Sequence, residues 1–317
     1  MLLTALRNRF RSATLFCAAL LPAGFFPVSH ALAQETPSAE SPEHAHIDEV
    51  LKGLNRGRFV GAVAVSPDGK RLAWTQGGRE GMEILVAPLG DLSKGERVTA
   101  ATKPDQHCRE GEPIWQPDSN ALAFFSDCAS TSGQGDLYLS PLDGSPARRL
   151  TDLEGYVHEP AFSPDGTRVA FLYVKGATRP AGALAAMKPP SGVIGEDDVE
   201  VQRVAVAAVD AASPQAPVEV TPANLHAYEF DWSPDSKSFA YIAADPPGEN
   251  NWWVAKLYTQ PLDGAPKSVL APPEVAGPLH GLQIAVPRWS PDGQAIAFIG
   301  GLMSDQGSTG GDVWIVS

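Results

Sequence analysis

One ten-residue pattern recurs five times along this chain, and it constrains the fold more than any other feature. The copies are VSPDGKRLAW from Val65, WQPDSNALAF from Trp115, FSPDGTRVAF from Phe162, WSPDSKSFAY from Trp232 and WSPDGQAIAF from Trp289. Ser, Pro, Asp and Gly in this order suit a type I turn, and the alternating run that follows suits a half-buried strand. Each copy therefore predicts a β-hairpin. Ser119 and Ser236 replace the glycine in two copies, which predicts the same turn under slight strain.

Two further strands are expected after most hairpins. Third-strand runs include MEILVAPLGD from Met82 and GDLYLSPLDG from Gly135, and short fourth runs include ERVTA from Glu96 and ARRLTD from Ala147. Four meandering strands form one propeller blade, which buries both faces only against neighbouring blades. The sequence therefore predicts an all-β fold over residues 59–317, a β-propeller of about five recognisable four-stranded blades. The last blade ends at GDVWIVS and is expected to be incomplete.

The first 58 residues differ in character from the repeats. Three arginines precede an apolar stretch, and Ala31-Leu32-Ala33 supplies small residues for cleavage, so residues 1–33 are predicted to be a signal peptide. Residues 34–58 are expected to form a linker and a short amphipathic helix. We therefore expect an exported protein, periplasmic or secreted, with no membrane span after signal removal, because the apolar stretch is short for a span.

Cys108 and Cys128 are the cysteines outside the predicted signal peptide. They flank the second hairpin at similar distances from its turn, which makes a disulfide plausible in an oxidising compartment. Closing a loop of about 20 residues would contribute on the order of 3 kcal/mol in the chain-entropy picture. The alternative is a pair of free or redox-active thiols, although neither the spacing nor a nearby helix start favours a reactive pair.

The charge and the motifs exclude several classes of function. A formal net charge of -13 argues against nucleic acid or an anionic membrane as partner. The sequence contains no G-x-S-x-G elbow, H-E-x-x-H, C-x-x-C or phosphate-binding loop, so it offers no recognisable catalytic motif. The histidines have no metal-binding spacing, and we expect neither a metal nor a cofactor. The adjacent acids Glu196, Asp197 and Asp198 are typical of a solvated loop rather than a glycosidase pair.

Two insertions interrupt the regular spacing of the repeats, from Val174 to Glu200 and from Asp245 to Trp253. Loops on a rigid scaffold often carry binding groups, so these insertions are candidates for one mouth of the propeller. The consecutive indoles of Trp252 and Trp253 favour this hypothesis, because neighbouring strand residues face opposite sides. Ordinary solvent loops are the alternative for both insertions.

The repeats and their insertions also carry a family resemblance. The stretches SPDGTRVAFLYVKGATRPAGALAAMKPPSGVIGEDDVEVQRVAV, YEFDWSPDSKSFAY, ENNWWVAKLYT and IAVPRWSPDGQAIAFIGGLMSDQGSTGGDVWIV resemble the N-terminal propeller of exported bacterial prolyl oligopeptidase-family peptidases. The branch is that of the dipeptidyl aminopeptidases and acylaminoacyl peptidases, and the hairpin repeats are also similar to TolB-like propellers. The resemblance runs from about Phe59 to Ser317. In that family an α/β-hydrolase domain with the Ser, Asp and His follows the propeller; we expect that domain to be absent here and the chain alone to have no peptidase activity.

The resemblance implies a non-catalytic propeller that gates or orients a peptide substrate, with a separately encoded hydrolase domain as a further candidate partner. It implies substrate contacts at Arg179, Glu196, Asn251 and Trp252. Glu196 would attract an α-amino group, and Trp252 would stack on an apolar side chain. The alternative is a stand-alone TolB-like propeller that binds a protein, peptide or glycan, and both accounts are open at this point.

Overall fold

The computed structural model describes residues 46–47, 49–50, 53, 59–78, 81–177, 199–246, 251–303 and 309–317. The chain divides into two compact units, Met1–Asn55 and Arg56–Ser317. In the first unit the few described residues are helical, and the predicted signal peptide lies outside the described residues. No helix in the described part of the chain is long and apolar enough to cross a membrane.

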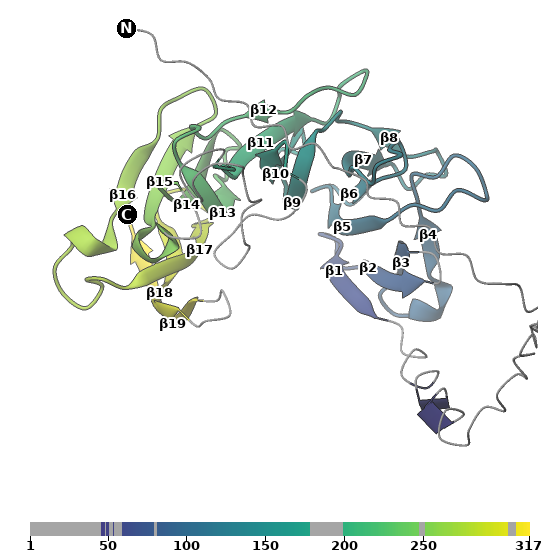
Figure 1. Ribbon diagram of the computed structural model, residues 1–317, viewed down its shortest axis with the longest axis horizontal. Coiled ribbons are helices and arrows are strands. Elements are labelled where there is room, and N and C mark those ends of the chain that lie inside the picture. The colour runs from purple at the N-terminus through teal and green to yellow at the C-terminus, as the bar shows by residue number, and fades with distance from the viewer. Residues whose placement is uncertain are drawn as a thin grey trace, which may run out of the picture. The chain divides into compact units, whose positions relative to one another are not determined.

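The second unit consists of antiparallel sheets that follow one another along the chain (Figure 1). The first sheet contains β1 (Val60–Val65), β2 (Arg71–Gly78), β3 (Gly81–Pro88) and β4 (Glu96–Val98). The second contains β5 (Glu110–Trp115), β6 (Leu122–Ser126), β7 (Asp136–Ser140) and β8 (Arg148–Arg149). The third contains β9 (Gly155–Phe162), β10 (Arg168–Lys175), β11 (Arg203–Ala208) and β12 (Val218–Glu219).

The fourth sheet contains β13 (His226–Trp232), β14 (Ser238–Ala244), β15 (Lys256–Pro261) and β16 (Lys267–Leu270). The fifth has three strands, β17 (Gln283–Trp289), β18 (Ile296–Met303) and β19 (Thr309–Val316). In the described segments the meanders are interrupted by three short 3-10 helices: η1 (Leu92–Lys94), η2 (Trp252–Val254) and η3 (Pro272–Glu274). The prediction of five blade-like sheets with an incomplete last one is confirmed in the described residues.

The five hairpin turns have the geometry that their sequences predict. In each turn the fourth residue donates its backbone N–H to the carbonyl of the first, as Gly69 does to Ser66 at 2.8 Å and Ser119 to Gln116 at 2.8 Å. The fourth residue has a positive φ in every copy, 65° at Ser119 and 62° at Ser236. The hydroxyls of the two serines also form hydrogen bonds. Ser119 Oγ accepts the Asp68 N–H at 3.1 Å, and Ser236 Oγ accepts the Asp165 N–H at 3.0 Å. Each donor belongs to the preceding sheet, so the serine links neighbouring turns.

Apolar clusters join each sheet to the next one along the chain. In the third sheet, Phe171 belongs to a cluster shared with the second sheet, and Leu172 belongs to a cluster shared with the fourth. The alternation of side chains along a strand produces this division, since successive residues point to opposite faces. We call the face toward the preceding sheet the leading face and the face toward the following sheet the trailing face. Burial of one such large apolar side chain stabilises the fold by roughly 1.5–3 kcal/mol.

The first strand of each sheet contains an irregularity of register, in contrast to the regular second strands. In three of them the irregularity includes an X-Pro pair whose first residue has a positive φ: Glu112 at 51°, Glu159 at 53° and Val286 at 54°. Non-glycine residues adopt this region at a cost, so these positions need compensating contacts. A bulge also re-aims side chains, and these bulges position the carboxylates described next.

Candidate ligand-binding site

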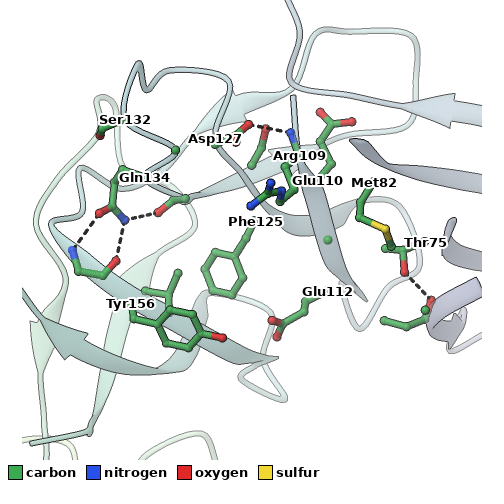
Figure 2. Close-up of a pocket in the computed structure, with 18 of the residues that line it drawn as sticks. Thr75, Met82, Arg109, Glu110, Glu112, Phe125, Asp127, Ser132, Gln134 and Tyr156 are labelled. Carbon is green, nitrogen blue, oxygen red and sulfur yellow. Dashed lines mark hydrogen bonds between the residues drawn. The ribbon is translucent and has the colours of Figure 1, made fainter. Parts of the chain in front are cut away.

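A cavity of about 580 Å³ opens among residues of the first three sheets (Figure 2). Its polar lining includes Arg109, Glu112, Gln134 and Tyr156, and Met82 and Phe125 contribute apolar surface. The volume lies within the range of roughly 300–1,000 Å³ that is usual for small-molecule sites. Residues from three successive sheets therefore form one site.

Arg109 lies immediately before β5, and its backbone is held firmly. Its N–H donates to Asp127 Oδ1 at 2.7 Å, and the Asp127 N–H donates to the Arg109 carbonyl at 3.3 Å. A disulfide between Cys108 and Cys128, with Cα atoms 5.0 Å apart, joins the same two strand ends. The Arg109 side chain is exposed, and among the described residues its guanidinium has no hydrogen-bond or ion-pair partner. The backbone of Arg109 is thus fixed in position, and its exposed guanidinium can bind an anionic group of a ligand.

Glu112 brings a carboxylate to the same cavity from the bulge of β5. Its Oε2 accepts the backbone N–H of Glu159 in β9 at 2.6 Å, so it connects the first strands of the second and third sheets. Burial raises the pKa of Glu112, and the Glu159 N–H opposes that change. Burial, together with the charge of Glu112, also raises the pKa of Tyr156, which keeps that hydroxyl protonated as a donor.

A similar contact recurs between the fourth and fifth sheets. The Glu229 carboxylate in β13 accepts the N–H of Val286, the positive-φ residue of the β17 bulge. Burial, together with repulsion from Glu229, raises the pKa of Glu159 to about 7, although Arg288 acts in the opposite direction. The Glu159 side chain is 55% exposed, so its carboxylate meets water even though protein atoms crowd it. With its pKa raised in this way, the Glu159 carboxyl changes its protonation state close to neutral pH.

The Gln134 side chain closes the edge of the cavity. It donates to the Gly135 carbonyl at 2.9 Å and to the Gly155 carbonyl at 2.8 Å, and it accepts the Gly155 N–H at 2.9 Å. Gly155 has a φ of 141°, and a Cβ there would lie 2.2 Å from the Val174 carbonyl oxygen. Glycine is required at this position because the backbone at the end of β10 approaches it too closely for a side chain.

A fully buried carboxylate lies next to the disulfide. Glu110 Oε1 accepts the Ala100 N–H at 2.7 Å and the Thr99 hydroxyl at 2.8 Å, while Oε2 has no hydrogen bond and lies 3.9 Å from Arg97 Nη2. Burial raises the pKa of Glu110. Cys108 and Cys128 lie close enough to complete a metal-ligand set with it, but their sulfurs are bonded to each other. No thiolate is available there, so the group does not suit a metal.

Of the residues that the resemblance implied as substrate contacts, the two that the structure describes, Asn251 and Trp252, are not among those that line this cavity. Arg179 and Glu196 lie outside the described residues. Asn251 Nδ2 donates to the Asp245 carbonyl at 2.8 Å. Trp252 is 8% exposed, with its ring centroid 6.2 Å from that of Tyr228 in the core shared by the fourth and fifth sheets. Their proposed contacts with substrate remain predictions.

Sequence reasoning missed Arg109, Glu112 and Tyr156 as a group. One signal was present: Pro113, Pro160 and Pro287 precede the turn prolines of their hairpins by the same interval. A proline at a fixed place in a predicted inner strand indicates a bulge or an edge. Two of these prolines follow a glutamate. Glu112 before Pro113 lines the cavity, and Glu159 before Pro160 donates its backbone N–H to Glu112.

The fold is that of a β-propeller-type protein, and the cavity is a candidate ligand-binding site. No family model matches the chain. It is 33% identical over 125 residues to a protein named TolB homolog from Chlorobium luteolum, covering 38% of this chain and 26% of that protein. It is 32% identical over 106 residues to an uncharacterized peptidase, YuxL, from Bacillus subtilis, covering 33% of this chain and 16% of that protein.

A solved structure extends the likeness over more of the chain. The structure of an acylaminoacyl peptidase in complex with Z-Gly-Gly-Phe-chloromethyl ketone matches with a TM-score of 0.52 and 13% identity, covering 78% of this chain and 36% of that one. The matched regions span about a quarter or less of the two curated relatives. The predicted resemblance to TolB-like propellers and to the propellers of such peptidases is confirmed at the level of fold.

Proposed function

We propose that this chain is a non-catalytic propeller that binds and orients peptides for a serine peptidase of the prolyl oligopeptidase type, in the periplasm or outside the cell. The observation that carries the proposal is the cavity lined by Glu112, Tyr156 and Arg109, whose guanidinium has no partner among the described residues. The similarity to peptidase and TolB sequences supports the peptide class of ligand and the export.

The chemistry of the lining suits the end of a peptide. A guanidinium binds a carboxylate through two parallel N–H donors, so Arg109 is suited to a free C-terminal carboxylate. Glu112 retains acceptor capacity for peptide N–H groups or an amine, and Met82 and Phe125 offer apolar contact to a side chain. Among the described lining residues there are two serines, Ser126 and Ser132, but no histidine that could pair with either for nucleophilic attack. The proposed role is binding, and the bond cleavage belongs to a hydrolase domain.

Calorimetric titration of the purified chain with short peptides tests this proposal. Peptides with a free C-terminal carboxylate are expected to bind at least about tenfold more tightly than the same peptides as amides, the equivalent of one charge-assisted contact. Arg109→Gln should remove that difference, whereas Arg168→Gln, a control at a hairpin away from the cavity, should retain it. Equal affinity of both peptide forms for the unchanged chain would contradict the proposal.

A stand-alone TolB-like propeller that binds a folded protein or a glycan is the second candidate. The TolB match favours it, since that alignment is slightly longer and slightly more identical than the peptidase match. This candidate predicts no measurable heat with short peptides, together with a specific cross-linked partner in cells that export the protein. The titration above therefore separates the two functions.

A further inference from the structure

Among the residues that the structure describes, none covers the leading face of the first sheet as the same face is covered in the other sheets. At equivalent positions of the second strands, the later sheets have side chains that are at most 4% exposed: Leu122, Phe124, Val169, Phe171, Phe239, Tyr241, Ile296 and Phe298. Leu72 and Trp74 occupy these positions in β2 and are only partly buried. Their partners in β1, Val65 and Val63, are 54% and 57% exposed. This surface is apolar and continuous along two strands.

The trailing face of the fifth sheet is uncovered in the same way. Ala297 and Ile299 in β18 are only partly buried, whereas Ala240 and Ile242 at the equivalent positions of β14 are 0% and 1% exposed. Their partners in β19, Ile315 and Val313, are each 72% exposed. Seven of the eight equivalent third-strand residues of the other sheets are buried, and the eighth, Thr259, is partly buried. The buried ones are Ile84, Val86, Leu137, Leu139, Val204, Val206 and Leu257.

These two faces are the two halves of an interface that the chain already forms four times. At every junction between successive sheets, a leading face with large side chains packs on a trailing face with an alanine flanked by larger residues. The free leading face has Leu72 and Trp74, and the free trailing face has Ala297 and Ile299. They are therefore complementary to each other rather than to themselves, and large exposed apolar patches commonly mark interaction sites.

We propose that the leading face of the first sheet docks on the trailing face of the fifth sheet of a second copy of this chain. The contact repeats the packing between consecutive sheets, so it continues the internal arrangement from one molecule into the next. Such a contact is heterologous, because different surfaces of the two copies meet. It buries the exposed valines of β1 against the exposed residues of β19 and removes both patches from water.

Two charged substitutions test the pairing without disturbing the core. Val65→Lys blocks the leading face and Ile315→Lys blocks the trailing face, and both side chains are more than half exposed in the single chain. Val218→Lys is the matched control, since Val218 is 66% exposed on β12 and belongs to neither face. Thermal unfolding midpoints equal to that of the unchanged chain will show that each variant is folded.

Sedimentation and light scattering across a range of concentrations give the readout. The unchanged chain and Val218→Lys should increase in mass with concentration, while each blocked variant alone should remain a monomer. An equimolar mixture of the two blocked variants should form a 1:1 dimer, because one retains a free trailing face and the other a free leading face. The proposal is overturned if the unchanged chain is a monomer throughout, if a blocked variant still self-associates, or if the mixture does not dimerise.

Discussion

The acidic residues of the hairpin turns and those of the first strands occupy opposite electrostatic environments. In the turns, Asp68, Asp165, Asp235 and Asp292 each accept a serine hydroxyl at 2.6 Å, and this hydrogen bond lowers the pKa of each carboxyl. In the first strands, burial raises the pKa of Glu110, Glu112, Glu159, Glu229 and Asp231. Both sets recur with the repeat.

The difference separates residues that stabilise the fold from residues that are held at a cost. A carboxylate whose pKa is lowered by native hydrogen bonds stabilises the folded state at neutral pH. A carboxylate whose pKa is raised opposes folding once it is ionised, so it persists only where surrounding contacts compensate. Groups of the second kind gather at functional sites more often than elsewhere. The first strands of this protein, rather than its more uniform turns, are therefore where binding is to be sought.

The largest effect is expected at the start of a first strand, at His226. This side chain is fully buried, and burial lowers its pKa to about 4 from an ordinary value of 6.5. Between these two pH values the imidazole of His226 binds more protons in the unfolded chain than in the folded chain. The free energy of unfolding therefore falls as the pH is lowered from 6.5 to 4. The loss should be about 3 kcal/mol. Urea unfolding at several pH values measures it.

The control for this effect is His280, which is exposed. His280→Gln should leave the acid-dependent loss unchanged, whereas His226→Gln should flatten the stability curve in this window even if it lowers the overall stability. An unflattened curve for His226→Gln would assign the acid sensitivity to other groups.

A smaller loss is expected when the contact between the second and third sheets is removed. Glu112→Ala leaves the Glu159 N–H without its acceptor, and an unsatisfied backbone donor should lower the free energy of unfolding by about 1–2 kcal/mol. Glu112→Gln retains an acceptor oxygen and should lose clearly less. Equal losses for the two variants in chemical denaturation would show that the hydrogen bond contributes nothing.

A pair of substitutions at one hairpin turn is expected to change the stability by a smaller amount. Ser119→Ala loses the hydrogen bond from the Asp68 N–H but retains the positive φ, so the stability should fall by about 1 kcal/mol. Ser119→Gly loses the same hydrogen bond but removes the backbone strain of the positive φ. These two contributions to the free energy of unfolding should nearly cancel. The same pair of substitutions at Ser236 should behave alike in thermal unfolding. A glycine variant as unstable as the alanine variant would refute the backbone contribution.

The smallest effect is expected at Glu159 and has the opposite sign to that of His226. Its carboxyl loses a proton near pH 4.5 in the unfolded chain and near pH 7 in the folded one, so the stability falls as the pH rises through that interval. Glu159→Gln should therefore stabilise the protein slightly at pH 8 and not at pH 4, with exposure to water keeping the gain small. A variant that is stabilised equally at both pH values would exclude this titration.

Much of the scaffold could be predicted from local sequence. The turn residues act on their own backbone, so Ser163, Pro164, Asp165 and Gly166 are sufficient to indicate a hairpin wherever they occur in this order. The burial of Trp252 could not be predicted in this way, because burial depends on which other sheet meets the residue, and here Tyr228 and the fifth sheet enclose it. The contacts implied at Arg179 and Glu196 are still predictions.

By itself the sequence determined the repeated unit: five hairpins, their strand alternation and the apolar faces that each sheet must bury. Only the tertiary structure decided where the candidate site lies, because the cavity forms where Met82, Glu112 and Tyr156 come together from three successive sheets. The physical reason is the different sequence separation of the interactions involved. Turn geometry and strand alternation depend on neighbours in sequence, whereas bulges, buried charges and uncovered faces depend on which sheet lies next in space.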